Sequence, residues 1–262
     1  MSFYEWFFLE KDRPAAGLFS WSHLLSVTII LAGFIVLAYF LGKKYKDNPK
    51  AQRLIIILTA ASLLTFYIMK HSFYLATTED VATTLIEMLP LFFCDMTIVV
   101  LPITAFARGR LLDICYDFIA ICGFIMGFAG NYLAGNIYGS HPAISYLSLI
   151  SAFEHSLSAF AAMFVFTARL NKMEKRNIPF TIGMLFIYMT ITLVVDYTLN
   201  KNFMFFMSGV GTPFDWFLNM VQGNLIAYQV IIYILQCGYM GLFYAIYYLV
   251  IKLINKKKQI KE

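Results

Sequence analysis

Two side chains that could carry out covalent catalysis, Cys94 and His155, lie inside long apolar segments of the sequence. A cysteine attacks as its thiolate, and an apolar environment disfavours that charged form, so the thiol needs a base or a cation close by. A histidine is suited to be that base. We therefore predict Cys94 as a nucleophile and His155 as its general base. The alternative is that both residues only pack in a core.

Other polar side chains occur in similar segments, where ionisable groups are rare because they are costly in a bilayer. Lys70 and Asp196 are expected to form a structural ion pair, since two opposite charges at one depth neutralise each other. Asp95 directly follows Cys94, but successive side chains on an α-helix point about 100° apart. We therefore expect Asp95 either to pair with Lys70 or to take part in catalysis.

The composition indicates where this chemistry would take place. Of the 262 residues, 60% are hydrophobic and 13% are charged, whereas soluble domains are about 45–50% apolar and about 25% charged. So few charges could not cover so much apolar surface in a soluble globule. The composition excludes a disordered chain, a nucleic-acid-binding protein, a coiled coil and a disulfide-rich secreted domain, and it predicts a polytopic membrane protein.

Seven segments are each apolar over about 20 residues, the length that crosses a bilayer as a helix. They are continuously apolar rather than alternating, which excludes transmembrane β-strands. The predicted fold is therefore all-α, a seven-transmembrane-helix bundle that forms a single domain over residues 1–262. The spans lie near residues 18–41, 54–75, 85–107, 111–132, 146–168, 178–198 and 226–250.

The positive charges predict how this bundle is oriented. Sixteen of the 20 Lys and Arg residues lie in the first, third and fifth loops between the spans and in the C-terminal tail. Because cytoplasmic loops carry the excess of Lys and Arg, we expect a multi-pass protein of the cell membrane with its N-terminus outside and its C-terminus in the cytoplasm. This topology also explains the net charge of +5 without a nucleic-acid partner.

In this topology several polar side chains converge on the outer half of the bilayer. Cys94 and His155 both lie roughly 14 Å from the outer ends of their helices. Pro90 and Pro102 flank Cys94, and because a proline bends a helix and frees a carbonyl group, we expect the third span to be deformed there. The other polar side chains on this side are His23, Lys70, His71, Asp196 and Gln229.

The segments around these residues resemble a known family. LPLFFCDMT (residues 89–97), the helix around His155 and VVDYTLNKNFMFF (residues 194–206) are similar to motifs of the YwaF family of bacterial integral membrane proteins, itself similar to the eukaryotic transmembrane protein 164. The usual forms are close to LPLHLC and NYMFL, and Phe92 replaces the histidine of the first. Positions that match the family are His23, Leu89, Pro90, Leu91, Cys94, Asn202, Met204 and Phe205.

The resemblance implies a Cys–His pair that acts on lipids. The eukaryotic relative is regarded as an acyltransferase of phospholipid acyl chains, and the family is similar in fold to intramembrane hydrolases of fatty-acid esters. On this resemblance Cys94 takes the acyl group and His155 is the base. Asn202 and Asp196 line the pocket. The oxyanion of such a reaction needs donors, and we expect them from Asn202, Gln229 or a backbone N–H freed near Pro90. The expected partners are membrane phospholipids, with no cofactor, no metal, no nucleic acid and no known protein partner.

Other functions are compatible with the same residues. A small-solute transporter or a proton-coupled membrane protein could use the outer-half polar pocket, although no inverted repeat is evident. A zinc site is chemically conceivable, since His23, His71, His155 and Cys94 are suitable ligands, but no two of them share a helix at i, i+4 spacing. A non-catalytic scaffold or sensor is the remaining alternative.

Overall fold

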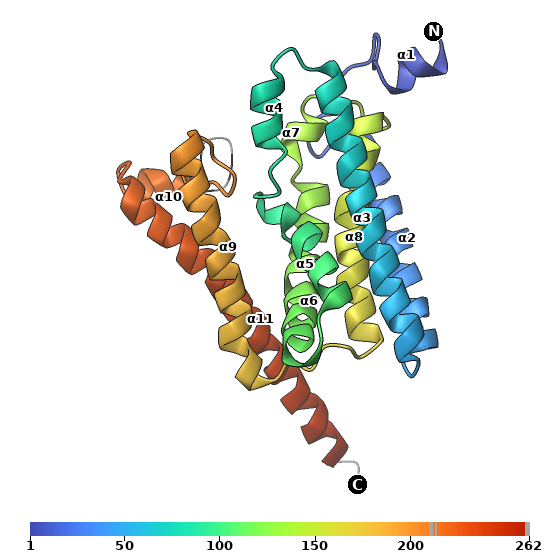
Figure 1. The fold of residues 1–262 in the computed structure, drawn as a ribbon, viewed down its shortest axis with the longest axis vertical. Helices are drawn as coiled ribbons and strands as arrows, with labels where there is room; N and C mark the ends of the chain where they lie inside the picture. Colours follow the sequence, from blue (N-terminus) through green and yellow to red (C-terminus); the bar gives the residue numbers. More distant parts are fainter. Residues whose placement is uncertain (210–211, 213, 260–262) are drawn as a thin grey trace. The chain divides into compact units, whose positions relative to one another are not determined.

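The computed structural model describes residues 1–209, 212 and 214–259, and this part of the chain is helical without strands (Figure 1). Within it, six helices are long and apolar enough to cross a membrane. Each overlaps one of the predicted spans, so the prediction of an all-α, multi-pass membrane protein is confirmed. They are α2 (Trp21–Tyr45), α3 (Pro49–Thr77), α6 (Gly109–Tyr132), α8 (Tyr146–Thr167), α9 (Ile178–Leu199) and α11 (Leu225–Gln259).

The chain forms two compact units. The first unit comprises Met1–Pro90 and Cys94–Lys172 and contains α2, α3, α6 and α8. The second unit comprises Leu91–Phe93 and Met173–Glu262 and contains α9 and α11. The chain therefore passes from the first unit into the second and back again within the segment predicted to be the third span.

That predicted third span, residues 85–107, is not one helix. It is divided among α4 (Val81–Glu87), the 3₁₀ helix η1 (Phe93–Asp95) and α5 (Met96–Phe106). Pro90 explains the break, because proline has no N–H to donate and disfavours the α conformation of the residue before it. At 11 residues, α5 is about 16 Å long and cannot cross an apolar core of about 30 Å by itself. Six of the seven predicted spans are therefore single long helices among the described residues, and the predicted third span is not.

The broken segment nevertheless joins the two ends of the first unit. At one end, which we call the Tyr146 end, the Tyr146 hydroxyl donates to the carbonyl of Met69 at 3.1 Å, close to the C-terminus of α3. At the other, the Arg53 end, the Arg53 guanidinium donates to the carbonyl of Ala105 at 2.8 Å, which connects the end of α5 with the start of α3. Residues 81–106 thus begin at the Tyr146 end and finish at the Arg53 end.

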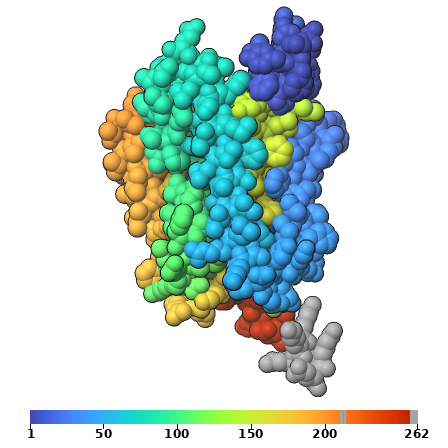
Figure 2. Space-filling view, turned by 45° about the vertical axis from the view of Figure 1, so that its right-hand side comes forward, coloured from blue at the N-terminus to red at the C-terminus, as the bar shows by residue number. Residues whose placement is uncertain are grey.

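The N-terminal segment lies at the Tyr146 end of the first unit (Figure 2). It contains the short aromatic helix α1 (Phe3–Phe7). The ring of Phe8 packs against that of Tyr146, with centroids 4.9 Å apart, and the Glu10 carboxylate lies 2.9 Å from Nδ1 of His141. Ring contacts and polar contacts therefore hold this segment to the first unit.

Small residues let α6 and α8 approach each other closely. A Cβ atom added to Gly127 would lie 2.4 Å from Cβ of Ala159, and one added to Gly123 would lie 2.6 Å from the carbonyl oxygen of Ser158. Close backbone packing of this kind stabilises helix pairs in membranes. Apolar side chains there gain little by leaving lipid for another helix, so association depends on tight contacts. The glycines of α6 therefore place α8 firmly, and α8 carries the predicted base.

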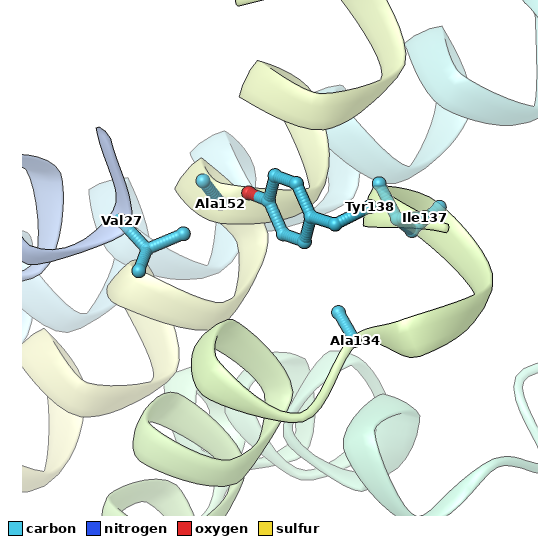
Figure 3. Close-up of a cluster of buried hydrophobic side chains, with 5 residues drawn as sticks. All are labelled: Val27, Ala134, Ile137, Tyr138 and Ala152. Carbon is cyan, nitrogen blue, oxygen red and sulfur yellow. The ribbon is translucent and has the colours of Figure 1, made fainter. Parts of the chain in front are cut away.

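A buried apolar cluster joins α2 and α8 to the segment after α6 (Figure 3). Its members are Val27, Ala134, Ile137, Tyr138 and Ala152. Tyr138 ends the short helix α7 (Gly135–Tyr138), and its hydroxyl donates to the carbonyl of Ser148 at 3.4 Å. The cluster thus fixes the N-terminal half of α8 from a second side.

In the second unit α9 packs against α11, and the segment between them contains α10 (Asp215–Met220). Three apolar residues of this segment, Phe203, Met204 and Phe206, are at most 1% exposed. The Phe206 ring packs against that of Tyr233 in α11, with centroids 5.1 Å apart. The loop after α9 is therefore folded onto the helices through its own apolar side chains.

Candidate functional site

Buried charged side chains of the first unit meet where α3 packs against α8 and against the segment that begins α5. Lys70 comes from α3, Cys94 and Asp95 come from η1, and Glu154 comes from α8. We call these four residues the charged cluster. The Cys94 thiol interacts electrostatically with the other three members. Such interactions are stronger in an apolar interior than in water.

Lys70 and Glu154 form the ion pair of the charged cluster. The ammonium nitrogen lies 2.5 Å from Oε2 of Glu154, and the two side chains are 15% and 5% exposed. The other carboxylate oxygen, Oε1, is buried and has no hydrogen-bond partner among the described residues. The prediction that Lys70 pairs with Asp196 is therefore wrong: similar depth in a bilayer does not determine which helix faces meet.

The Cys94 thiol donates a hydrogen bond to Oδ1 of Asp95, with sulfur and oxygen 3.7 Å apart. Cys94 is half-buried, and Asp95 is 6% exposed. The expectation that these neighbours point apart assumed that both lie within an α-helix. Instead Cys94 lies in the 3₁₀ turn η1, and Asp95 is the N-cap of α5 without a side-chain capping bond. Its carboxylate therefore accepts from the thiol and does not cap α5.

Tyr67 covers the charged cluster from α3. Its hydroxyl donates to the carbonyl of Met88 at 2.6 Å, where α4 has ended and the helical partner of that carbonyl is lost. The Lys70 ammonium lies 5.3 Å from the centroid of the Tyr67 ring, within the range of a cation–π interaction. The ring of His71 meets the same ring edge-on, at 4.2 Å between centroids. His71 thus lies beside the cluster, in contact with Tyr67.

His155 is positioned by its own helix and by α6. Its Nδ1 lies 2.8 Å from the carbonyl oxygen of Ser151, and because a carbonyl only accepts, Nδ1 carries the proton and Nε2 is left as the acceptor of the neutral imidazole. The ring lies on Gly130, where an added Cβ would be 1.9 Å from Cδ2. His155 therefore has the tautomer that a general base requires. The His155 ring bonds to the carbonyl of Ser151, whereas the Cys94 thiol bonds to the carboxylate of Asp95.

His23 is fully buried and holds α2 to α6. Its Nδ1 accepts a hydrogen bond from the backbone N–H of Phe19 at 3.1 Å, so Nε2 carries the proton and donates to the carbonyl of Asn131 at 2.9 Å. The ring also packs against that of Tyr138, with centroids 3.9 Å apart. Both ring nitrogens are thus bonded to backbone, which is a structural arrangement.

Asp196 and Asn202 organise the loop of the second unit. Oδ1 of Asp196 accepts from the N–H of Phe203 at 2.9 Å. Oδ1 of Asn202 accepts from the N–H of Met207 at 2.9 Å, and its Nδ2 donates to the carbonyl of Ser208 at 2.8 Å. These side chains therefore replace backbone partners in an irregular segment, as Asx turns do.

Two further positions lie in the second unit. Nε2 of Gln229 donates to the hydroxyl of Tyr197 at 2.8 Å. Phe92, which stands in place of the motif histidine, meets Phe203 edge-on with ring centroids 5.1 Å apart. The segment around Phe92 and the segment around Phe203, which carry two of the family motifs, are therefore in contact through aromatic rings.

Metal-ligand chemistry has no support in this arrangement. Over the ranges that the structure describes, no three His, Cys, Asp or Glu side chains are grouped so that they could hold a metal ion. His23 and His155 are instead bonded to backbone carbonyls. The zinc site considered from the sequence is therefore not found among these residues.

The family model named TMEM164 family matches residues 18–254, which is most of the chain and includes every candidate site residue. The chain belongs to the TMEM164 family. No curated relative and no solved structure matches it. Family membership and the long apolar helices together identify a multi-pass membrane protein.

In this TMEM164-family protein the structure brings together only part of the predicted site. The Cys94 thiol bonds to Asp95 and interacts electrostatically with Lys70. Asp196 and Asn202 instead bind backbone groups of their own loop, and Gln229 binds Tyr197. Glu154 is the cluster residue that sequence reasoning missed as a partner of Lys70. A signal for it exists, because Glu154 is the only charged residue within the 22-residue helix α8, and such a charge in a membrane requires a partner.

Proposed function

We propose that this TMEM164-family protein is a YwaF-like enzyme of the cell membrane that transfers or hydrolyses phospholipid acyl chains through a thioester on Cys94. The observation that carries the proposal is the hydrogen bond from the Cys94 thiol to Asp95, together with the electrostatic interaction of the thiol with the Lys70 ammonium. In an apolar environment a cysteine nucleophile requires an acceptor for its proton and a positive charge near its thiolate. The charged cluster meets both requirements.

The proposed topology has seven crossings, with residues 81–106 as a discontinuous crossing. This segment connects the Tyr146 end of the first unit with the Arg53 end, where Arg53 binds the carbonyl of Ala105. The basic loops that follow α2, α5 and α8 lie at the Arg53 end, since Gln52 donates to the carbonyl of Ala168 at 3.4 Å. The positive-inside rule then assigns the Arg53 end to the cytoplasm and the N-terminus to the outside.

In the first half-reaction the Cys94 S–H bond breaks and its proton moves to the carboxylate of Asp95. The thiolate sulfur attacks the carbonyl carbon of a phospholipid acyl ester, a C–S bond forms and the ester C–O bond breaks. The lysophospholipid leaves as an alcohol that takes the proton, and the acyl chain stays on sulfur as a thioester. Lys70 favours this step, because its positive charge offsets the negative charge that develops on the reacting atoms.

In the second half-reaction the hydroxyl group of a second lipid, or of water, attacks the thioester carbon. The C–S bond breaks, the acyl chain becomes an ester or a free fatty acid, and the proton of the attacking hydroxyl returns to the Cys94 sulfur. His155 is the base that the family resemblance implies, and its unprotonated Nε2 suits that role. We propose Asp95 for the first proton transfer and His155 for the activation of the acceptor hydroxyl.

Substrate binding by the other predicted site residues remains a proposal. They are His23, His71, Asp196, Asn202 and Gln229, and their hydrogen bonds and ring contacts lie within the protein. Membrane phospholipids are the proposed partners, because the helices around the charged cluster are apolar enough to lie in lipid. A lipid ester reaches a buried thiol from the side, between helices, without crossing water.

The test is acyl transfer by the purified protein in vesicles that contain a phospholipid with an isotope-labelled acyl chain, followed by lipid mass spectrometry. We expect Cys94→Ala to abolish both the labelled products and a hydroxylamine-sensitive label on the protein. The matched control is Cys122→Ala, since Cys122 is a fully buried free cysteine of α6. Asp95→Asn and His155→Gln then separate the two proton transfers, because the first should stop thioester formation and the second should let the thioester accumulate.

Acyl transfer that is unchanged in Cys94→Ala would remove the proposal. A wild-type protein that produces no labelled lipid, but takes up a polar solute into vesicles, would favour the transporter alternative instead. Thioester formation in both Asp95→Asn and His155→Gln at the wild-type rate would keep Cys94 as the nucleophile and remove the assigned bases.

A further inference from the structure

One face of the C-terminal part of α11 lines a groove in the second unit. The groove has a volume of about 660 Å³, and the described residues that line it are Tyr248, Ile251, Lys252, Asn255 and Lys256. Residues three or four positions apart lie on one side of an α-helix, so these side chains share a face. The wall of the groove therefore combines an aromatic ring, an aliphatic side chain, an amide and two ammonium groups.

The polar residues of this wall suit an anion. Lys252 and Lys256 are both exposed and lie one turn apart, about 6 Å along the helix axis. Asn255, on the same face, adds an amide group with two donors. No acidic residue is among the described residues that line the groove. The groove therefore offers several hydrogen-bond donors and an excess of positive charge, which is what a phosphate group requires.

A third cation comes from a distant part of the sequence. Lys175 precedes α9, and its Nζ lies 5.6 Å from the centroid of the Tyr248 ring, within the range of a cation–π interaction. The acid next to it, Glu174, forms an ion pair with Arg176. Lys175 therefore adds positive charge beside a residue of the groove, so that two segments of the second unit contribute cations there.

The side chains next to these lysines favour a lipid over a dissolved anion. Ile251, Leu253 and Ile254 are exposed aliphatic residues of a helix that is long and apolar enough to cross a membrane. Aliphatic groups at the end of such a helix lie against acyl chains, whereas lysine ammonium groups reach the headgroups. A dissolved phosphate would engage only the lysines, but a phospholipid satisfies both kinds of side chain.

We propose that this groove binds an anionic phospholipid, with its phosphate on Lys252 and Lys256 and the first carbons of an acyl chain on Ile251. Lysine clusters that directly follow a membrane-spanning helix attract anionic lipids. The proposed topology, with an external N-terminus and seven crossings, gives this end of α11 to the cytoplasmic leaflet, which is the anionic one. The groove contains no residue of the charged cluster, so this lipid site is independent of the proposed acyl transfer.

The experiment measures lipid binding to the full-length protein in maltoside micelles by native mass spectrometry, without turnover. The protein is titrated with phosphatidylglycerol and, separately, with phosphatidylcholine that has the same acyl chains. Both titrations use one ionic strength, because salt screens contacts between exposed charges. We expect phosphatidylglycerol to bind about 10-fold more tightly, since only this lipid has a net negative charge.

The variant Lys252→Gln/Lys256→Gln removes two ammonium groups from the groove. We expect it to bind phosphatidylglycerol about 25-fold more weakly, a factor of about five for each lysine, and to bind phosphatidylcholine as the wild type does. The matched control is Lys43→Gln/Lys44→Gln, which removes the same charge from the last turn of α2. Adjacent side chains on a helix point about 100° apart, so these two lysines do not share one phosphate and the control should keep the wild-type affinity.

Two further measurements identify the source of the phosphate. Ile251→Gln removes an apolar contact but no charge, and it should weaken the binding of phosphatidylglycerol. Inorganic phosphate in excess should not displace the lipid from the wild-type protein. All variants should unfold at the wild-type temperature without added lipid, because the substituted side chains are exposed.

Three results would overturn the proposal. Equal binding of the two lipids would mean that the groove does not select for charge. Equal losses in Lys252→Gln/Lys256→Gln and Lys43→Gln/Lys44→Gln would mean that binding follows the total charge and not this groove. Displacement of the lipid by inorganic phosphate, or unchanged lipid binding in Ile251→Gln, would mean that the groove is a site for a dissolved anion. None of these results bears on acyl transfer, which Cys94→Ala tests.

Discussion

The two units of this protein use their buried polar side chains in different ways. In the first unit Lys70 and Glu154 bring opposite charges from two helices into contact, and Asp95 accepts from a thiol. In the second unit Asp196 and Asn202 bind backbone groups of the loop that follows them. Lys70 and Glu154 thus meet each other in the first unit, whereas Asp196 and Asn202 meet the main chain in the second.

This difference bears on where the proposed reaction would take place. Side chains that bind an irregular backbone replace the partners that a helix would otherwise provide, so they shape a loop. Charges that meet other charges at membrane depth are costly to bury and do not shape the backbone. We therefore place the proposed reaction at the charged cluster and assign the motif of the second unit to loop structure.

The largest effect that would test this comparison concerns Lys70. Lys70→Ala leaves the buried carboxyl group of Glu154 without its ammonium partner, and we expect a loss of about 3–5 kcal/mol in the free energy of unfolding at neutral pH. The control is Lys172→Ala, because Lys172 and its partner Asp113 are 53% and 16% exposed and such exposed pairs contribute less than about 1 kcal/mol. Denaturant unfolding in detergent measures both. Equal losses in the two variants would contradict the special position of the charged cluster.

An intermediate effect is expected at the contact between α6 and α8. Gly130→Ala places a Cβ 1.9 Å from Cδ2 of His155, so the imidazole must move, and we expect a loss of about 1–3 kcal/mol together with reduced acyl transfer. Gly33→Ala is the control, since its Cβ would have no neighbour within 4 Å and alanine favours a helix by up to about 1 kcal/mol. A Gly130→Ala protein with wild-type stability and activity would show that the position of His155 is unimportant.

The smallest effect on acyl transfer is expected for the loop of the second unit, although the loss of stability is similar to that of Gly130→Ala. Asp196→Ala leaves the buried N–H of Phe203 without its acceptor, which costs about 1–3 kcal/mol. Asp196→Asn keeps an acceptor oxygen, so we expect a smaller loss and acyl transfer close to that of the wild type. If Asp196→Asn folds normally but loses acyl transfer, then Asp196 binds substrate and the contrast between the two units fails.

Six of the predicted spans could be recognised from the sequence because hydrophobic length is a local property of a segment. The third span could not, although Pro90 was a correct sign of deformation there. The effect of Pro90 depends on whether other groups form hydrogen bonds with the backbone atoms that lose their helical partners. Here the Tyr67 hydroxyl donates to the carbonyl of Met88. A bent helix and a broken one therefore have the same local sequence.

The candidate site, too, could be predicted from the sequence only in part. Cys94 and Lys70 could be selected from the sequence, because a thiol between two prolines and a cation in an apolar span are both local sequence patterns. Glu154 was not recognised as the partner of Lys70, and Asp95 was expected to point away from the thiol. Both errors concern directions around a helix axis, which hydrophobicity alone does not specify when helices are apolar on all sides.

The sequence by itself determined the membrane class, the helical fold and six long spans, since these follow from the length and composition of separate segments. It also placed most of the positive charge in alternate loops. Only the tertiary structure decided that Lys70 meets Glu154, that Cys94 donates to Asp95 and that His155 lies on Gly130. These contacts depend on close packing and on the break near Pro90, and both arise only when distant segments are folded together.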